Sequence, residues 1–328
     1  MIDPKMYLND VMDPEIPQTP IRYGFGEGLV EAGAINTSVV AICADLTVST
    51  KMDGFAKSYP ERFVEIGIAE QNMVTVAAGM ALAGKIPFVS SYAAFSPGRN
   101  WEQIRTTVCL NQTNVKIVGS HAGVSVGPDG ATHQMLEDIT LMRVLPNMTV
   151  VVPADAEEAR KATIALAATY GGAYLRLARE KSPVVTTIKT PFSLGKANVL
   201  RTGTDVTIVA CGQMVYQALV AAEQLAKSGI EAEVINAAVV KPLDNQTIIA
   251  SARKTGAVVT VEEGQIAGGL GGAVAETLAD HHPVPMTRIG MNDRFGESGE
   301  ANELLENFGL TAPSIAKRTQ QLLKRKDH

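Results

Sequence analysis

The chain alternates short apolar runs with longer segments in which small, apolar and charged residues are mixed. VVAICA at 39–44 and VKIVG at 115–119 are rich in β-branched residues, which is typical of strands buried on both faces of a sheet. Ala-rich segments at 72–83 and 156–169 have instead the residue types and length of helices. This alternation of strand and helix predicts an α/β fold built on a parallel sheet.

The alternation is interrupted between residues 181 and 204 by prolines and glycines, and then restarts with the strand-like run DVTIVA. We therefore predict two α/β domains, at residues 1–185 and 201–328, joined by an ordered linker at 186–200. The first residues, up to Pro20, contain several prolines. We expect them to form an arm that lies on the surface or on a partner.

Composition excludes several classes of protein. The 328 residues carry a net charge of −5, whereas a general nucleic-acid binder is normally basic. No apolar run approaches the roughly 20 residues that a membrane span needs, and the N-terminus lacks the pattern of a signal peptide. The three cysteines lie far apart, without the spacing of a zinc site or a disulfide framework, which favours a reducing, cytoplasmic location.

Glu70 lies where a strand-like run, FVEIGI, leads directly into a predicted helix. An acidic residue at this position commonly complements the helix dipole. Its neighbours Ile66, Ile68 and Met73 are apolar, and burial of a carboxyl group among them would suit proton relay. Both interpretations remain open from these residues alone.

The segment PFVSSYAAFSPGR carries Tyr92 and Phe95 three positions apart. Aromatic side chains at this spacing usually belong to a core. The surrounding serines and the Pro–Gly pair are instead typical of a loop at a strand end, where ligands bind in α/β proteins. The segment is therefore a candidate for core and for the wall of a cleft.

A glycine-rich loop, SHAGVSVGPDGATHQ at 120–134, follows another predicted strand and contains His121, Asp129 and His133. These polar side chains either face solvent or contact a substrate. A metal site is disfavoured, because all three would have to converge from one loop and no fourth ligand is evident. We predict no metal ligands on this chain.

These motifs, in this order, resemble the C-terminal half of a transketolase. IGIAEQNM, PFVSSYAAF and GPDGATHQ are followed by VEEG and GGLGG, and the resemblance covers nearly the whole chain. It implies a parallel-sheet, pyrimidine-binding domain for thiamine diphosphate and a smaller, mixed-sheet C-terminal domain. The motifs are also similar to those of 1-deoxy-D-xylulose-5-phosphate synthase and, more distantly, of 2-oxo-acid dehydrogenase β subunits, which use the same cofactor.

The resemblance implies cofactor contacts for four residues. Glu70 matches the catalytic glutamate that hydrogen-bonds the N1′ nitrogen of the aminopyrimidine ring, a bond that favours the tautomer able to take the proton from the thiazolium C2. Phe95 matches the aromatic residue stacked on that ring, with Tyr92 beside it. Asp45 matches an aspartate near the cofactor.

The resemblance also implies substrate contacts. Asp129 and His133 match a pair that hydrogen-bonds sugar hydroxyls and can discriminate their stereochemistry, and His133 would also move protons at the reacting carbon. Four further residues match a site for the sugar phosphate, a dianion that arginine pairs well: Arg22, Ser49, His121 and Arg179. His121 distinguishes the transketolase pattern from the deoxyxylulose synthase pattern, which lacks a histidine at this position.

The chain departs from the family pattern at two places. Relatives often carry an aromatic residue or an arginine where this chain has Gly98, with Arg99 adjacent. The family binds the magnesium diphosphate group through a GDG motif, and this sequence contains none. We therefore expect a second polypeptide, an N-terminal subunit with the GDG domain, to bind the diphosphate and Mg²⁺ in an α2β2 assembly.

Together these features predict the C-terminal subunit of a two-chain transketolase, which would transfer a two-carbon ketol unit from a ketose phosphate to an aldose acceptor. Two alternatives remain. One is a subunit of another thiamine diphosphate enzyme, of the deoxyxylulose phosphate synthase or 2-oxo-acid dehydrogenase type. The other is a non-catalytic binding module that has kept the fold.

Overall fold

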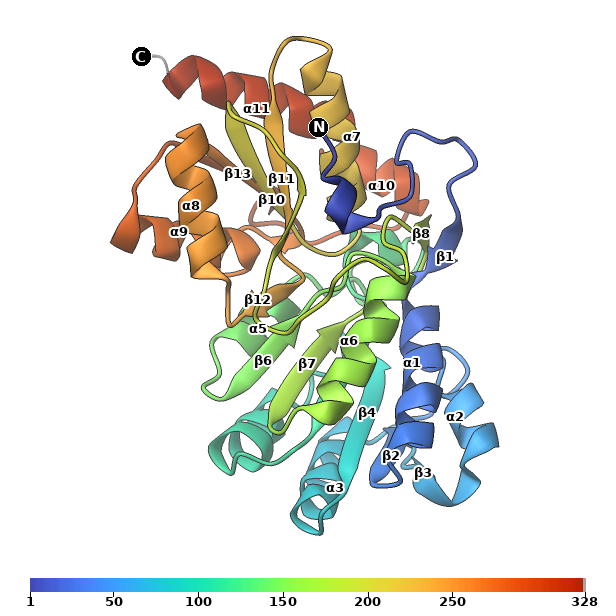
Figure 1. Ribbon diagram of the computed structural model, residues 1–328. Coiled ribbons are helices and arrows are strands. Elements are labelled where there is room, and N and C mark those ends of the chain that lie inside the picture. Colours follow the sequence, from blue (N-terminus) through green and yellow to red (C-terminus); the bar gives the residue numbers. More distant parts are fainter. Residues whose placement is uncertain (327–328) are drawn as a thin grey trace.

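The computed structural model describes residues 1–326 and contains two main sheets, which lie in opposite halves of the molecule (Figure 1). In spatial order the seven-stranded sheet consists of β12 (Val239–Lys241), β6 (Met148–Val151), β7 (Gly172–Arg176), β5 (Lys116–Ser120), β4 (Ile86–Tyr92), β2 (Val39–Cys43) and β3 (Phe63–Glu65). The five-stranded sheet consists of β14 (Met286–Met291), β13 (Val258–Gln265), β10 (Val206–Ala210), β11 (Ala232–Asn236) and β9 (Asn198–Arg201). Residues 327–328, at the end of the predicted second domain, lie outside the described residues.

Each main sheet is parallel except for one edge strand, β12 in the first and β9 in the second. The predicted α/β fold class is therefore confirmed. The predicted strands at 39–44 and 115–119 agree with β2 and β5 to within one residue. β12 was not anticipated: it belongs to the second half of the sequence, yet it pairs with β6 and completes the first sheet.

Helices flank both sheets (Figure 1). Those in the first half are α1 (Ile21–Ile35), α2 (Asp53–Ser58), α3 (Glu70–Leu82), α4 (Trp101–Gln103), α5 (Asp138–Arg143) and α6 (Ala156–Ala168). Those in the second half are α7 (Met214–Ala226), α8 (Asn245–Thr255), α9 (Leu270–His281), α10 (Ala301–Asn307) and α11 (Ala312–Lys326). α4 continues as a π-helical segment, Ile104–Leu110, and 3₁₀ turns cover Pro4–Met6, Pro60–Arg62 and Val124–Val126. No helix within residues 1–326 is long and apolar enough to cross a membrane.

α1 and α6 lie side by side on one face of the first sheet (Figure 1). Glycines on α1 allow this close approach: a Cβ on Gly24 would lie 1.7 Å from the carbonyl oxygen of Ala156, and one on Gly28 would lie 2.7 Å from that of Arg160. Real Cβ contacts are never so short, so the helix pair requires glycine at both positions.

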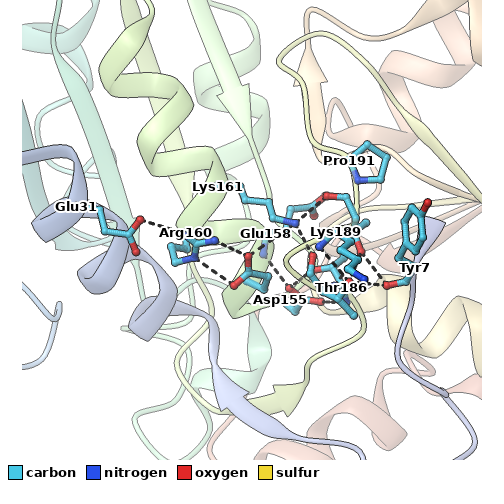
Figure 2. Close-up of polar contacts among 12 residues, drawn as sticks. Tyr7, Glu31, Asp155, Glu158, Arg160, Lys161, Thr186, Lys189 and Pro191 are labelled. Atoms are coloured by element: carbon cyan, nitrogen blue, oxygen red, sulfur yellow. Dashed lines mark hydrogen bonds and ion pairs between the residues drawn. The ribbon is translucent and has the colours of Figure 1, made fainter. Parts of the chain in front are cut away.

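Polar contacts hold the linker against the start of α6 and the N-terminal arm against the linker (Figure 2). The Asp155 carboxylate accepts hydrogen bonds from the backbone N–H and the hydroxyl of Thr186, at 2.6 and 2.7 Å. Lys161 donates to the carbonyl oxygens of Thr187 and Thr190, and the Thr187 hydroxyl donates to the carbonyl oxygen of Tyr7. The arm therefore contacts the linker of its own chain.

Candidate active site

The parallel strands of the first sheet bring several of the predicted site residues to one edge. β2, β3, β4, β5 and β7 run in the same direction, so their carboxyl ends lie together, which is where α/β sheets bind ligands. We call this the active-site edge. The residues that end or follow these strands there are Asp45, Glu70, Tyr92, Phe95, His121 and Arg179.

Glu70 is the first residue of α3, and only 1% of its side chain is exposed. Its carboxylate accepts a hydrogen bond from the Ser91 hydroxyl at 3.2 Å and one from Nη1 of Arg99 at 2.7 Å. Nδ2 of Asn100 donates to the Glu70 carbonyl oxygen at 2.9 Å. Two residues from the end of β4 and the loop after it therefore orient this carboxylate, and a third holds the backbone of Glu70.

Four rings lie next to one another near the Glu70 carboxylate, two from aromatic residues and two from histidines: Tyr92, Phe95, His121 and His133. The Tyr92 ring stacks on the His121 imidazole with centroids 3.9 Å apart, and on the Phe95 ring at 5.9 Å. The His133 imidazole meets the Phe95 ring edge-on at 5.5 Å. The two aromatic residues therefore line the edge beside the two histidines.

Positive charge gathers next to these rings. Nη1 of Arg22 donates to the Ser49 carbonyl oxygen at 2.6 Å and lies 3.5 Å from Nε2 of His121. Arg179 donates to the Val126 carbonyl oxygen at 2.6 Å. Nε of Arg22 is buried and has no hydrogen-bond partner among residues 1–326.

His121 is uncharged at neutral pH. Burial, followed by the nearby charges of Arg22 and Arg179, lowers the pKa of its imidazole to about 3. Nδ1 of the ring lies 2.8 Å from the Ser120 hydroxyl, which fixes the orientation of the imidazole. Because arginine can only donate, Nε2 of this neutral imidazole is the acceptor in the contact with Arg22, and the ring adds no charge beside the two arginines.

The glycine-rich loop (residues 120–134) is held by the second half of the chain. The Glu263 carboxylate accepts hydrogen bonds from the Ser125 backbone N–H at 2.7 Å and from Nε2 of Gln213 at 2.5 Å. It fills the space where a Cβ on Gly123 would lie, 2.3 Å from its Cδ. On the other side, Gln134 donates to the carbonyl oxygen of Glu297. The loop that carries His133 is therefore positioned by residues far away in the sequence.

Three of the predicted site residues, Asp45, Ser49 and Asp129, are partly or fully exposed and make few side-chain contacts with the rest of the site. Asp45 is exposed, with its backbone in the left-handed region (φ 57°), and its N–H donates to the Glu65 carboxylate. Ser49 contacts Arg22 through its carbonyl oxygen. Asp129 is also exposed, with a carboxylate oxygen 3.7 Å from Nη1 of Arg179.

Several residues that shape the site were missed from the sequence. They are Ser91, Asn100, Gln134, Gln213 and Glu263, together with Arg99, which the sequence analysis noted only as the neighbour of Gly98. Ser91 and Asn100 lie in or next to the aromatic segment, so proximity in sequence was the available signal. Glu263 had no such signal, because it reaches the glycine-rich loop only through the packing of the two halves. Within residues 1–326 no group of three or more His, Cys, Asp or Glu side chains is arranged to hold a metal ion.

Fold and site together describe a two-domain α/β subunit with a candidate ligand site at the carboxyl edge of its first sheet. Two family models match: "Transketolase, pyrimidine binding domain" at residues 18–184 and "Transketolase, C-terminal domain" at residues 195–315. The chain belongs to the transketolase family.

Three similar proteins cover almost the same length of chain. A putative transketolase C-terminal section of Methanocaldococcus jannaschii is 45% identical over 308 residues, which are 93% of this chain and 96% of that protein. The 6-deoxy-6-sulfo-D-fructose transketolase subunit SqwH of Clostridium sp. is 41% identical over 320 residues, 98% and 99% of the two chains. A solved structure described as "Split gene transketolase, inactive beta4 tetramer" superposes with a TM-score of 0.87 at 45% identity, over 94% of this chain and 100% of that one.

Proposed function

We propose that this chain is the C-terminal subunit of a two-chain transketolase, which transfers a two-carbon ketol unit from a ketose phosphate, or a similar anionic ketose, to an aldose. The observation that carries the proposal is the buried Glu70 carboxylate, fixed at the active-site edge within reach of the Phe95 segment. Full-length similarity to transketolase C-terminal subunits supports it.

The site suits thiamine diphosphate. Glu70 would hydrogen-bond the aminopyrimidine ring, and Phe95 and Tyr92 would contact its face, because a buried carboxylate and neighbouring aromatic rings match a flat, polar heterocycle. Asp45 would lie near the cofactor at the end of β2. When bound, thiamine diphosphate supplies the nucleophilic carbon and the electron sink for the transfer.

The remaining residues of the edge would bind the sugar. Arg22, Arg179 and the neutral His121 form a site for its anionic group, with Ser49 beside Arg22. Asp129 and His133 would hydrogen-bond the hydroxyls, and His133 would hold or move a proton at the reacting carbon. Phosphate and sulfonate both suit this site, and a panel of phosphorylated and sulfonated ketoses would distinguish them.

A second polypeptide is needed for the diphosphate group and Mg²⁺. Apolar side chains next to the active-site edge support a protein contact there: Ile68 is 74% exposed and Val48 is 67% exposed. We propose that an N-terminal subunit with a GDG motif covers this surface, in an α2β2 assembly. Native mass spectrometry of the co-expressed chains would measure the stoichiometry.

Reconstitution tests the proposal. This chain, a candidate N-terminal subunit, thiamine diphosphate and Mg²⁺ should together transfer ketol units without releasing carbon dioxide. Glu70→Ala should reduce turnover by about 100-fold or more while circular dichroism stays unchanged, and Glu102→Ala, at an exposed carboxylate on α4, should leave it intact. Pyruvate consumption with carbon dioxide release would favour the deoxyxylulose phosphate synthase or 2-oxo-acid dehydrogenase alternatives. No cofactor binding would favour a non-catalytic module.

A further inference from the structure

Arg99 lies at the position where the proposed function requires a ligand. Its Nη1 is 2.7 Å from Oε2 of Glu70, and its guanidinium carbon is 4.8 Å from the centroid of the Phe95 ring. Arg99 therefore contacts both the Glu70 carboxylate and the face of the Phe95 ring. The proposed function assigns these same two groups to the aminopyrimidine ring of the cofactor.

A guanidinium group resembles such a ring in the features that matter here. It is planar, it donates hydrogen bonds in its plane and it stacks on aromatic faces. It thus satisfies the Glu70 carboxylate, which is nearly fully buried and would otherwise lack an ionic partner.

The two members of this ion pair differ in freedom. The Glu70 side chain is 1% exposed and is also held by the Ser91 hydroxyl, and Asn100 holds the Glu70 backbone, whereas the Arg99 side chain is 48% exposed. Arg99 can therefore turn into solvent without opening the core, whereas movement of Glu70 would break its hydrogen bond to Ser91 inside the protein. The long side chain of arginine has several rotamers in solvent to occupy once it is displaced.

From this geometry we infer that Arg99 is a placeholder: it occupies the cofactor-ring half-site of the free chain and must swing out when the ring binds between Glu70 and Phe95. The inference rests on the proposed function. It also gives a role to Arg99, which follows Gly98 at the position where this chain departs from the family pattern. In the free subunit Arg99 would pair with the Glu70 carboxylate. The cofactor can bind only to molecules in which Arg99 has left Glu70. Its apparent affinity is therefore reduced by the fraction of molecules in which Arg99 still contacts Glu70.

Cofactor affinity in the reconstituted complex tests the inference. Calorimetric titration with thiamine diphosphate and Mg²⁺ should show about fivefold or tighter binding for Arg99→Gln than for the wild type. Arg99→Met should behave similarly, since it also removes the charge. Arg105→Gln, which removes a charge from an exposed position in the following helical segment, should bind like the wild type. Unchanged or weaker binding by the Arg99 variants would overturn the inference and leave the proposed function standing.

The isolated chain supplies an independent readout. Arg99→Gln should lower the thermal midpoint by about 2–4 °C relative to Arg105→Gln, because the buried Glu70 loses its ion partner. Adding Glu70→Gln to Arg99→Gln should restore most of this loss. Equal midpoints for Arg99→Gln and Arg105→Gln would show that the pair does not form in solution, which also overturns the inference. Failure of every variant and of the wild type to bind the cofactor would instead reject the proposed function.

Discussion

The imidazole of His121 lies flat on the ring of Tyr92, with centroids 3.9 Å apart, while Arg22 approaches its Nε2 atom to 3.5 Å. This arrangement keeps the imidazole neutral, with its pKa lowered to about 3 chiefly by burial. The proposed anion site would thus combine two permanent cations with one neutral imidazole.

We predict that the NMR signals of His121 do not titrate between pH 5 and 8 in the isolated chain. The unfolded chain takes up this proton near the ordinary value of 6.5, so the free energy of unfolding should fall as the pH drops from 6.5 towards 3. His121→Asn identifies the signal by its loss. A titration midpoint near 6.5 would contradict the predicted neutral state.

Arg179→Gln should raise the KM for a phosphorylated or sulfonated donor by about tenfold or more, with a smaller change in kcat, because a charge-assisted hydrogen bond to the substrate is lost. A neutral donor of the same sugar should show little change. Arg105→Gln is the matched control, since it removes the same charge elsewhere. Equal effects on anionic and neutral donors would assign Arg179 a structural role.

Gly123→Ala should displace the glycine-rich loop. Its backbone is in the left-handed region (φ 94°), and the added Cβ would lie 2.3 Å from Cδ of Glu263. We expect a loss of about 1–3 kcal/mol in stability and faster hydrogen exchange across residues 120–134. The KM for the sugar should rise because His133 lies on the same loop. The control is Gly79→Ala in α3, where the Cβ would enter open space. Unaltered exchange in the loop would show that Glu263 does not constrain it.

Glu158→Gln should remove part of the pH dependence of stability. Burial, with the nearby Asp155 charge, raises the pKa of Glu158 to about 7 from 4.5. The native state therefore binds this proton more tightly than the unfolded state, and stability should fall as the pH rises from 4.5 through 7. Urea denaturation at pH 5 and pH 8 should show a smaller difference for the variant, by about 1–3 kcal/mol.

The side-chain amide that this substitution introduces can be accommodated. Nδ2 of Asn236 donates to both carboxylate oxygens of Glu158, and its Oδ1 has no partner within the described part of the chain. A flip of the Asn236 amide would let it accept from the new side chain. Glu157→Gln, one position earlier on α6, leaves the Glu158 carboxyl in place and should keep the wild-type pH dependence. An equal loss of pH dependence in both variants would contradict the assignment.

The local parts of the fold and site could be predicted because their signals lie in consecutive residues. Buried strands read as β-branched runs, and the segments around Glu70, Phe95 and His133 each combine turn residues with chemistry-bearing side chains. Parallel strands then bring such segments to one edge without any further information.

The rest depends on contacts between distant residues. The pairing of β12 with β6, and the contact of Glu263 with the glycine-rich loop, join segments separated by many residues, and short apolar or acidic runs do not indicate their partners. The Arg99–Glu70 pair depends on the direction in which a loop turns after β4, and residue types alone do not determine that direction.

The edge strand β12 has a consequence for how this polypeptide can be divided. Only residues 237 and 238 separate it from β11, so the backbone passes directly from the smaller sheet into the larger one. An N-terminal fragment that ends at the linker would lack β12. Its strand β6 would then be an exposed edge strand with unpaired backbone groups, which promotes aggregation. The first sheet is thus complete only when the second half of the chain supplies its edge strand.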